Sequence, residues 1–452
     1  MLKKQPWFTP DGGIEYLYRQ LCEEGLEVSH LKDKIDEVAA LPPGSPERIE
    51  LACSLYEEID RVDKRIADYP YEEPDTMEEI IKCRPGKVKL EPYPAGQDEQ
   101  LDKVYGAWLA RCAGCLLGQP VEGWNRDRIN NLCSETGNFP VHYYISSDLP
   151  KEITDKYGMV NMLSWANNRP VNWINNVSFM PEDDDTNYTI IGLKILETYG
   201  KTFTSDDVAE CWLNNLPMFH TCTAERVAYR NIAGGILPPR SAQYRNPFRE
   251  WIGAQIRADF FGYIAPGNTE LAADYAWRDA VISHTKNGIY GEMMVAAMIA
   301  AAAVSTDVNT VINAGLSVIP GNCRLAQKIV EVLSMKRKGL SCEQVIDDIH
   351  NNYNEKTEHD WCHTIPNAMI MVSSLLYGEN SLEKVFGYAL MSGFDTDCNC
   401  ATAGSILGMM LGAKALPDKW ISVLNDTVMS GVDGFGRVSI LSLAKRTAAF
   451  IG

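Results

Sequence analysis

The sequence predicts a mostly α-helical domain that begins near residue 101 and is preceded by a helical extension. Small and apolar residues recur at helical spacing in four segments: KVYGAWLARCAGCLLGQPVEGW, GEMMVAAMIAAAAV, LSVIPGNCRLAQKIVEVL and CNCATAGSILGMMLGAKAL. Alternating strand patterns are scarce, and residues 141–147 (VHYYISS) form the best candidate strand. No repeat of about 20 to 50 residues indicates a solenoid.

Residues 1–100 are predicted to form a helical hairpin followed by a linker. Leu31, Ile35 and Val38 lie on one face of a first helix, which LPPGSP interrupts. Ser45 is expected to cap a second helix, with Pro46 at its first position. The apolar face of this helix is expected to consist of Ala52, Leu55, Ile59, Val62 and Ile66. We expect the hairpin to pack on the main domain or to form a homo-oligomer by packing on a second subunit.

The main domain, predicted to span residues 101–452, contains two segments rich in small residues. Residues 293–304 form the longest apolar run, which is too short to span a bilayer and is interpreted as a buried helix. Gly404, Gly408 and Gly412 are four residues apart, so one helix presents a glycine face for close packing. In GAQIRADFFGY, Arg257 and Asp259 form a polar pair that is either structural or a substrate contact.

Composition and charge limit the classes of function. Of 452 residues, 45% are hydrophobic and 23% charged, as in globular proteins, and the net charge of −18 disfavours nucleic acid and anionic membranes as partners. No apolar run follows Lys3 and Lys4, so we expect no signal peptide. Thirteen scattered cysteines favour the reducing cytoplasm. Cys112 and Cys115 have redox or zinc spacing without a second pair, and we interpret them as a buried structural pair.

Two acidic segments of the form Asp-x-Asp-x-Asn lie far apart, at residues 183–187 (DDDTN) and 395–399 (DTDCN). Each precedes an apolar helix, and Gly200 is expected to end the first. Amides at a helix start stabilise one carboxylate, but charges about 4 Å apart repel by about 4 kcal/mol at an effective dielectric constant near 20. Two such segments therefore predict a site for one or two hard divalent cations such as Mg²⁺.

Four segments in this order, GAWLARCAGCLLGQPVEG, PEDDDTNYTIIGL, SHTKNGIYGEMMVAAMIAAA and SGFDTDCNCATAGSILG, resemble the ADP-ribosylglycohydrolase family. This family includes dinitrogenase-reductase-activating glycohydrolases and crystallin J1 type proteins. The resemblance covers residues 103–452 and leaves the extension outside. It implies an all-α orthogonal helical bundle with a dinuclear magnesium centre in a cleft, Mn²⁺ being the alternative cation.

The resemblance also implies roles for individual residues. The metal ligands would be Asp183, Asp184, Asp185, Asp395, Asp397 and Cys398. The catalytic residues would be Glu122, Asp184 and Asp185, and the substrate-binding residues His284, Gly393, Phe394 and Asn399. Three positions depart from the family, which often has Thr at Asp183 and Cys398 and Gly at Phe394. Because a thiol is a poor ligand for Mg²⁺, either water fills that vertex, one ion binds weakly, or the metal is softer.

We therefore expect a magnesium-dependent glycosidase that removes ADP-ribose from a modified protein or a small acceptor. Such a reaction passes through an oxocarbenium-like state and needs a positioned water and a protonated leaving group. The cations would orient the ribose diol and lower the pKa of a bridging water. Glu122 would lie over the ribose or act as acid or base.

Three alternatives to this function stay open. An N-glycosidase of the same fold would act on another ribosylated small molecule or a nucleoside. A catalytically inert binding protein is disfavoured because buried acids without a metal are costly. A prenyl-diphosphate lyase would use DDxxD-type acids, but residues 347–351 (DDIHN) fit only half of such a site.

Overall fold

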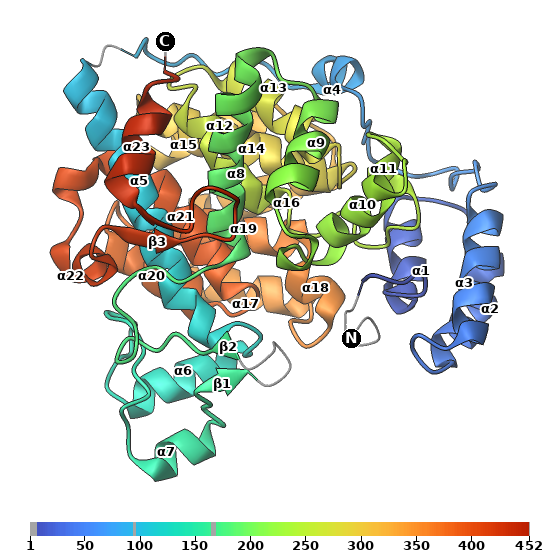
Figure 1. The fold of residues 1–452 in the computed structure, drawn as a ribbon, viewed down its shortest axis with the longest axis horizontal. Helices are drawn as coiled ribbons and strands as arrows, with labels where there is room; N and C mark the ends of the chain where they lie inside the picture. Colours follow the sequence, from blue (N-terminus) through green and yellow to red (C-terminus); the bar gives the residue numbers. More distant parts are fainter. Residues whose placement is uncertain (1–6, 94–95, 164–168, 452) are drawn as a thin grey trace.

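The computed structural model describes residues 7–93, 96–163 and 169–451, so residues 1–6 and 94–95 of the predicted extension and linker lie outside it. The protein is all-α, as predicted: helices form the body, and the two sheets of the described residues have two short antiparallel strands each (Figure 1). No helix among the described residues is long and apolar enough to cross a membrane.

The N-terminal segment contains α1 (Ile14–Glu23), η2 (Ser29–Leu31), α2 (Lys32–Ala40), α3 (Pro46–Ile59) and α4 (Met77–Cys83), and α1 to α3 enclose a small apolar core of their own (Figure 1). The predicted start of α3 is confirmed, because Ser45 accepts a hydrogen bond from the Arg48 amide and Pro46 is the first helical residue. The predicted continuation to Ile66 is wrong. The chain turns back after Ile59, and the Ile66 amide donates to the Gly25 carbonyl.

The extension packs on the main domain through charged residues, one of them partly exposed and one buried. Glu23 at the end of α1 lies 3.2 Å from His359 Nε2 and 3.5 Å from His363 Nε2. In the linker, the Glu73 carboxylate binds Arg324 at 2.9 Å, and neither side chain is exposed by more than a tenth. The extension thus contacts the main domain through α1 and the linker. The packing partner of the α2–α3 hairpin and the domain boundary near residue 100 stay predictions.

Replacing Glu23 with glutamine is expected to destabilise the protein by roughly 1–3 kcal/mol, because hydrogen bonds to a charged group are lost. Burial alone would raise the pKa of Glu23, but the bond from His359 and the charge of Arg324 hold it below its usual value near 4.5. The loss of unfolding free energy in the variant should therefore be largest above about pH 4.5. It should become smaller as the pH falls below that value. Thermal unfolding at several pH values measures this loss, with Glu37→Gln, at an exposed position of α2, as the control.

The remaining elements follow in chain order. The first of these helices are α5 (Gln97–Gly118), η3 (Gln119–Val121), α6 (Arg126–Glu135), α7 (Lys151–Lys156), α8 (Asp184–Tyr199), η5 (Gly200–Thr202), α9 (Ser205–Asn215), η6 (Met218–His220) and α10 (Thr223–Ala233). The next are α11 (Arg240–Gln243), η7 (Gln255–Arg257), α12 (Asp259–Tyr263), α13 (Thr269–Ala280), α14 (Asn287–Ala302), α15 (Val308–Leu316), α16 (Arg324–Arg337) and α17 (Cys342–Asn352). The last are α18 (Glu358–Cys362), α19 (Thr364–Tyr377), α20 (Leu382–Met391), α21 (Thr396–Leu411), η8 (Ala413–Ala415), α22 (Asp418–Ile421), η9 (Ser422–Leu424) and α23 (Ile440–Ala448). The strands are β1 (Met162–Leu163), β2 (Arg169–Pro170), β3 (Thr427–Met429) and β4 (Arg437–Ser439).

Two predictions about buried helices are confirmed. Every residue of α14 is buried, which places the long apolar run in the centre of the core. Gly404 and Gly408 let α21 lie directly against α5, because a Cβ there would come within 2.5 Å of the Ala110 carbonyl oxygen and 2.3 Å of the Gly106 carbonyl oxygen. Gly412 instead ends α21 with a φ of 80°.

The predicted strand at residues 141–147 does not form. This segment belongs to the arm that carries α6, α7 and the β1–β2 hairpin, below the helical body in Figure 1. Side chains accept hydrogen bonds from its backbone amides: Asn138 accepts from the Tyr143 amide, and Asn175 accepts from the Ser147 amide. A strand needs a neighbour to pair with, and side-chain amides take that place here.

Candidate metal centre

The two acidic segments, 212 residues apart, meet where α8 and α21 begin beside the end of α5. One carboxylate oxygen each of Asp183, Asp185 and Asp397 and the sulfur of Cys115 all lie within 4.8 Å of one another. All four residues are buried. The convergence that the sequence predicted is therefore present for these residues, and a cation between them would contact both segments.

A second group adjoins the first and shares Asp397 with it. Ligand atoms of Asp395, Asp397 and Cys398 also lie within 4.8 Å of one another. The Cys362 thiol donates a weak hydrogen bond to Asp395 Oδ2 at 4.0 Å. We call Asp183, Asp184, Asp185, Asp395 and Asp397 the acid cluster.

The side chain of Asp183 caps the N-terminus of α8. Asp183 has an extended φ of −151°, and its Oδ1 accepts from the Asp185 amide at 3.1 Å. Its other oxygen accepts from Gln119 Nε2. The helix then runs to Tyr199 and ends at Gly200 with a φ of 70°, as predicted. Asp185 consequently points into the protein, with 0% exposure, whereas Asp184 is half-buried.

Arg111 of α5 balances part of the negative charge beneath the cluster. Its Nη2 donates to Asp185 Oδ1 at 3.1 Å and to the Asp185 carbonyl at 2.7 Å, and its Nη1 lies 2.9 Å from Asp259 Oδ2. The expected pairing of Arg257 with Asp259 is wrong, since Arg257 binds Glu225 and other acids. Arg111 holds Asp185 by one oxygen and leaves the other for a further partner.

The turn before α21 has an unusual backbone. Gly393 and Phe394 have φ values of 72° and 56°, and the second is rare for an aromatic residue. The Glu355 carboxylate accepts from the Arg126 amide at 3.0 Å, and a Cβ at Gly393 would lie 2.3 Å from that carboxylate. The Phe394 side chain is fully buried, and its ring centroid lies 5.0 Å from that of His350. In this structure the Phe394 ring faces the protein interior.

The end of α5 lies directly on the start of α21. The Gly118 carbonyl accepts from Thr396 Oγ1 at 3.0 Å. A Cβ at Gly118 would lie 2.3 Å from the Asp397 amide nitrogen and 2.4 Å from its Cα. Only glycine allows this approach, so α5 positions the second acidic segment through backbone contact.

Burial and mutual repulsion raise the pKa values of these groups. Burial and Asp183 raise the pKa of Asp397 to about 6. The pKa of Asp185 is raised well above its usual value by burial and by Asp397, even though Arg111 opposes the shift. Burial, Asp397 and Glu122 raise the pKa of Asp395. A bound divalent cation would reverse these shifts by favouring the ionised carboxylates.

The donor set fits a divalent cation. Asp185 Oδ2 and Asp397 Oδ1 are buried and have no hydrogen-bond partner among the described residues. Buried carboxylate oxygens are costly without a partner, and hard cations such as Mg²⁺ or Mn²⁺ prefer oxygen ligands. The cluster can therefore hold a metal through Asp183, Asp185, Asp395 and Asp397, with the half-buried Asp184 beside them.

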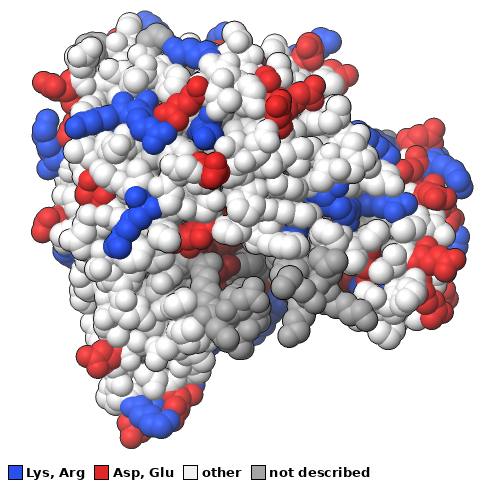
Figure 2. All heavy atoms as spheres, viewed as in Figure 1, with Lys and Arg blue, Asp and Glu red and all other residues white. Residues whose placement is uncertain are grey.

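Glu122 is exposed and lies near enough to Asp395 to raise the pKa of that residue. It follows η3, directly after the end of α5. Figure 2 shows a hollow between the helical body and the arm that carries α6 and α7, with acidic side chains at its edge. Glu122 is thus the predicted site residue that solvent reaches most easily.

Two other predicted substrate contacts are buried. Asn399 donates to Asn367 Oδ1 at 2.8 Å, and its own Oδ1 has no hydrogen-bond partner among the described residues. His284 lines a cavity of about 570 Å³ whose wall includes Asp75 and Trp277 but no member of the acid cluster. Burial and the charge of Arg257 hold the pKa of His284 well below its usual value, so the ring is neutral.

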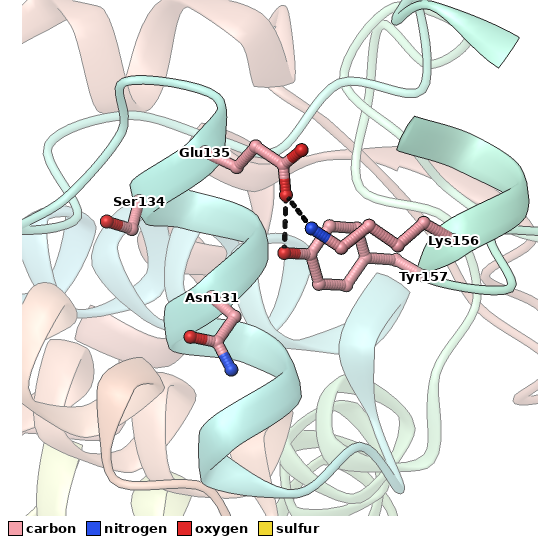
Figure 3. Close-up of a pocket in the computed structure, with 5 residues that line it drawn as sticks. All are labelled: Asn131, Ser134, Glu135, Lys156 and Tyr157. Atoms are coloured by element: carbon pink, nitrogen blue, oxygen red, sulfur yellow. Dashed lines mark hydrogen bonds and ion pairs between the residues drawn. The ribbon is translucent and has the colours of Figure 1, made fainter. Parts of the chain in front are cut away.

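A shallow pocket of about 400 Å³ lies between α6 and α7 (Figure 3). Its only carboxylate among the lining residues, Glu135, points at Lys156 and Tyr157 and bonds them at 2.5 and 2.7 Å. The charge of this acid is satisfied within the protein, so the pocket is a weaker candidate for a functional site than the acid cluster.

Sequence reasoning missed three residues of the site: Arg111, Cys115 and Gln119. A signal for Arg111 was present, because a single charge within the apolar run GAWLARCAGCLLG has to meet a buried acid. Both members of the predicted Cys112–Cys115 pair are buried, but Cys115 also faces the acid cluster. Spacing along one helix cannot reveal which distant segment packs against each cysteine.

Residues 96–450 match a family model described as ADP-ribosylglycohydrolase. The chain is also similar to a solved structure described as an ADP-ribosylglycohydrolase-related protein complex, with 16% identity and a TM-score of 0.41, over 78% of this chain and 98% of that one. The comparison with curated proteins gives no match.

Proposed function

Because the chain belongs to the ADP-ribosylglycohydrolase family, we propose that it is a metal-dependent hydrolase of a ribosyl glycosidic bond. The proposed substrate is ADP-ribose linked to a modified protein or a small acceptor, and the proposed cofactor is Mg²⁺, with Mn²⁺ as a substitute. One observation carries the proposal: buried oxygens from both acidic segments converge within 4.8 Å beside Cys115.

The proposed chemistry divides the work among the residues of the site. When bound, the cations would orient the ribose diol and lower the pKa of a water near the anomeric carbon. Asp183, Asp185, Asp395 and Asp397 would hold them. Arg111 would keep Asp185 in place through its 3.1 Å bond. Glu122 would exchange a proton with the leaving group or the water, because it is exposed beside Asp395.

Replacing Glu122 with glutamine is expected to lower kcat by about 10²- to 10⁴-fold, the usual contribution of a general acid or base. The melting temperature should not change, because the side chain is exposed. Steady-state kinetics with thermal unfolding checks both points. Glu152→Gln, an exposed carboxylate on α7, serves as the control and should keep full activity. Wild-type kcat in the Glu122 variant would remove the role.

The experiment that tests the proposed function is a substrate panel with and without Mg²⁺. It contains arginine-, serine- and acetyl-linked ADP-ribose together with simple nucleosides. Release of ADP-ribose that depends on Mg²⁺ supports the proposal. Cleavage of nucleosides alone would replace it with the N-glycosidase alternative. A protein that binds Mg²⁺ in calorimetry but cleaves nothing in the panel would be the inert member of the fold.

A further inference from the structure

We infer that the acid cluster is a mixed carboxylate–thiol centre in which Cys115 ligates a thiophilic divalent cation of the Zn²⁺ class more tightly than Mg²⁺ binds. The inference rests on the proposed function in one respect only, that a divalent cation occupies this cluster. It concerns which cation binds best and which atoms of this chain bind it.

The position of Cys115 is that of a ligand. Its sulfur lies within 4.8 Å of oxygens from Asp183, Asp185 and Asp397, and its side chain is 0% exposed. A tetrahedral zinc ion has bonds of about 2.3 Å to sulfur and about 2.0–2.2 Å to carboxylate oxygen. Because the four ligand atoms lie within 4.8 Å of one another, small side-chain movements would bring all of them to bonding distance from one such ion.

Two residues of the same group each have one carboxylate oxygen that is available to a cation. Asp185 Oδ2 and Asp397 Oδ1 are buried without a hydrogen-bond partner among the described residues, and their side chains are 0% and 3% exposed. Arg111 already binds Asp185 Oδ1, so Asp185 presents a single oxygen. Single-oxygen carboxylates and one sulfur match the small coordination number of zinc better than the six oxygens that Mg²⁺ requires.

Sulfur is present on the other side of the cluster as well. Cys398 shares a group with Asp395 and Asp397, and the Cys362 thiol contacts Asp395 at 4.0 Å. All 13 cysteines, these three included, are free rather than disulfide-bonded. Thiolates favour zinc and other soft cations over Mg²⁺, and the thiol proton is released when the sulfur–metal bond forms.

A different cluster with similar ligand types is a poorer metal site. Glu23, His359 and His363 also place ligand atoms within 4.8 Å. The His363 Nδ1 accepts from the Ile365 amide at 3.2 Å, so its proton sits on Nε2, the atom that faces Glu23. A nitrogen that carries a proton cannot ligate, and this cluster instead holds the Glu23 carboxylate in place.

The test is absorption spectroscopy of the full-length protein titrated with Co²⁺, which reports a sulfur–metal bond directly. Wild type should show a sulfur-to-cobalt charge-transfer band in the near ultraviolet, and Zn²⁺ should abolish it by competition. Cys115→Ser should lose the band and bind Zn²⁺ at least about tenfold more weakly. Its affinity for Mg²⁺ should stay the same or increase. Cys112→Ser, a buried cysteine on the same helix, is the matched control and should keep the band.

The outcomes separate this inference from the proposed function. Binding of Co²⁺ without a sulfur band, or an unchanged band in Cys115→Ser, would overturn the inference and leave the function in place. A band that is lost in Cys398→Ser instead would move the ligand role to that residue and overturn the assignment to Cys115. Sulfur-dependent Co²⁺ binding without glycosidic cleavage would support the inference while the proposed function fails.

Discussion

Asp397→Ala is expected to abolish metal-dependent turnover while the protein stays folded. Asp397 is the only residue that both groups of ligand atoms share among the described residues, so its loss affects every cation position of the cluster. Even the loss of an outer partner of a metal site costs about 10- to 100-fold, and a shared ligand should cost at least the upper value. Calorimetric titration with Mg²⁺ should then show no binding heat, and kcat should fall to the level without metal.

The fold should tolerate this change because the metal-free cluster is itself destabilising. The pKa of Asp397 is raised to about 6, so the folded state binds more protons than the unfolded state between the usual pKa near 3.8 and pH 6. Metal-free stability therefore falls as the pH rises through this window. Asp397→Asn, which stays neutral, should gain in melting temperature relative to wild type from pH 4 to pH 7. An equal difference in melting temperature at pH 4 and pH 7 would contradict the raised pKa of Asp397. Unchanged turnover in Asp397→Ala would contradict its role as a metal ligand.

Local features of the sequence were sufficient to predict the elements that carry the site. An acid stands at the N-cap position of each helix, and Asp183 caps α8 with its side chain. The stop at Gly200 needs only a residue that tolerates a φ of 70°. The long apolar run likewise predicted the buried α14. These features depend only on residues that are close in the sequence, so a single sequence is sufficient to predict them.

The failures share a different physical cause. Arg111 binds Asp185 and Asp259, and Cys115 faces three acids, through contacts that only the packing of α5 on α8 and α21 creates. The predicted strand at residues 141–147 lacks a partner strand, and partner strands are chosen by tertiary structure. The convergence of the acids was predicted from the two matching Asp-x-Asp-x-Asn segments, and the resemblance to one family supported it.

The glycine contacts of α5 connect the fold to the site. The helix touches the cluster at Gly118, where a Cβ would overlap the backbone of Asp397. A side chain in this position could not be relieved by a rotamer change, because the Asp397 amide nitrogen and Cα belong to the first turn of α21. The geometry of the cation site thus depends on a residue that carries no functional group.

Gly118→Ala is accordingly expected to displace the start of α21 and damage the centre. Its Cβ would lie 2.3 Å from the Asp397 amide nitrogen, so the two helices have to separate. Overpacking of this kind costs about 1–3 kcal/mol in stability, and a shift of about 1 Å in a reacting group can cost about 100-fold in rate. Thermal unfolding, Mg²⁺ calorimetry and kcat measure the three consequences.

Two matched variants separate packing from positioning. Gly114→Ala places a Cβ 2.2 Å from the Cys400 carbonyl oxygen, one helical turn before Gly118, and should lower the melting temperature similarly while reducing cation affinity less. Gly86→Ala, where a Cβ meets no atom within 4 Å, should change neither quantity. If Gly114→Ala and Gly118→Ala lost cation affinity equally, the effect would be general loosening of the helix pair. A larger loss in Gly118→Ala means that the backbone of α5 positions Asp397 for the metal.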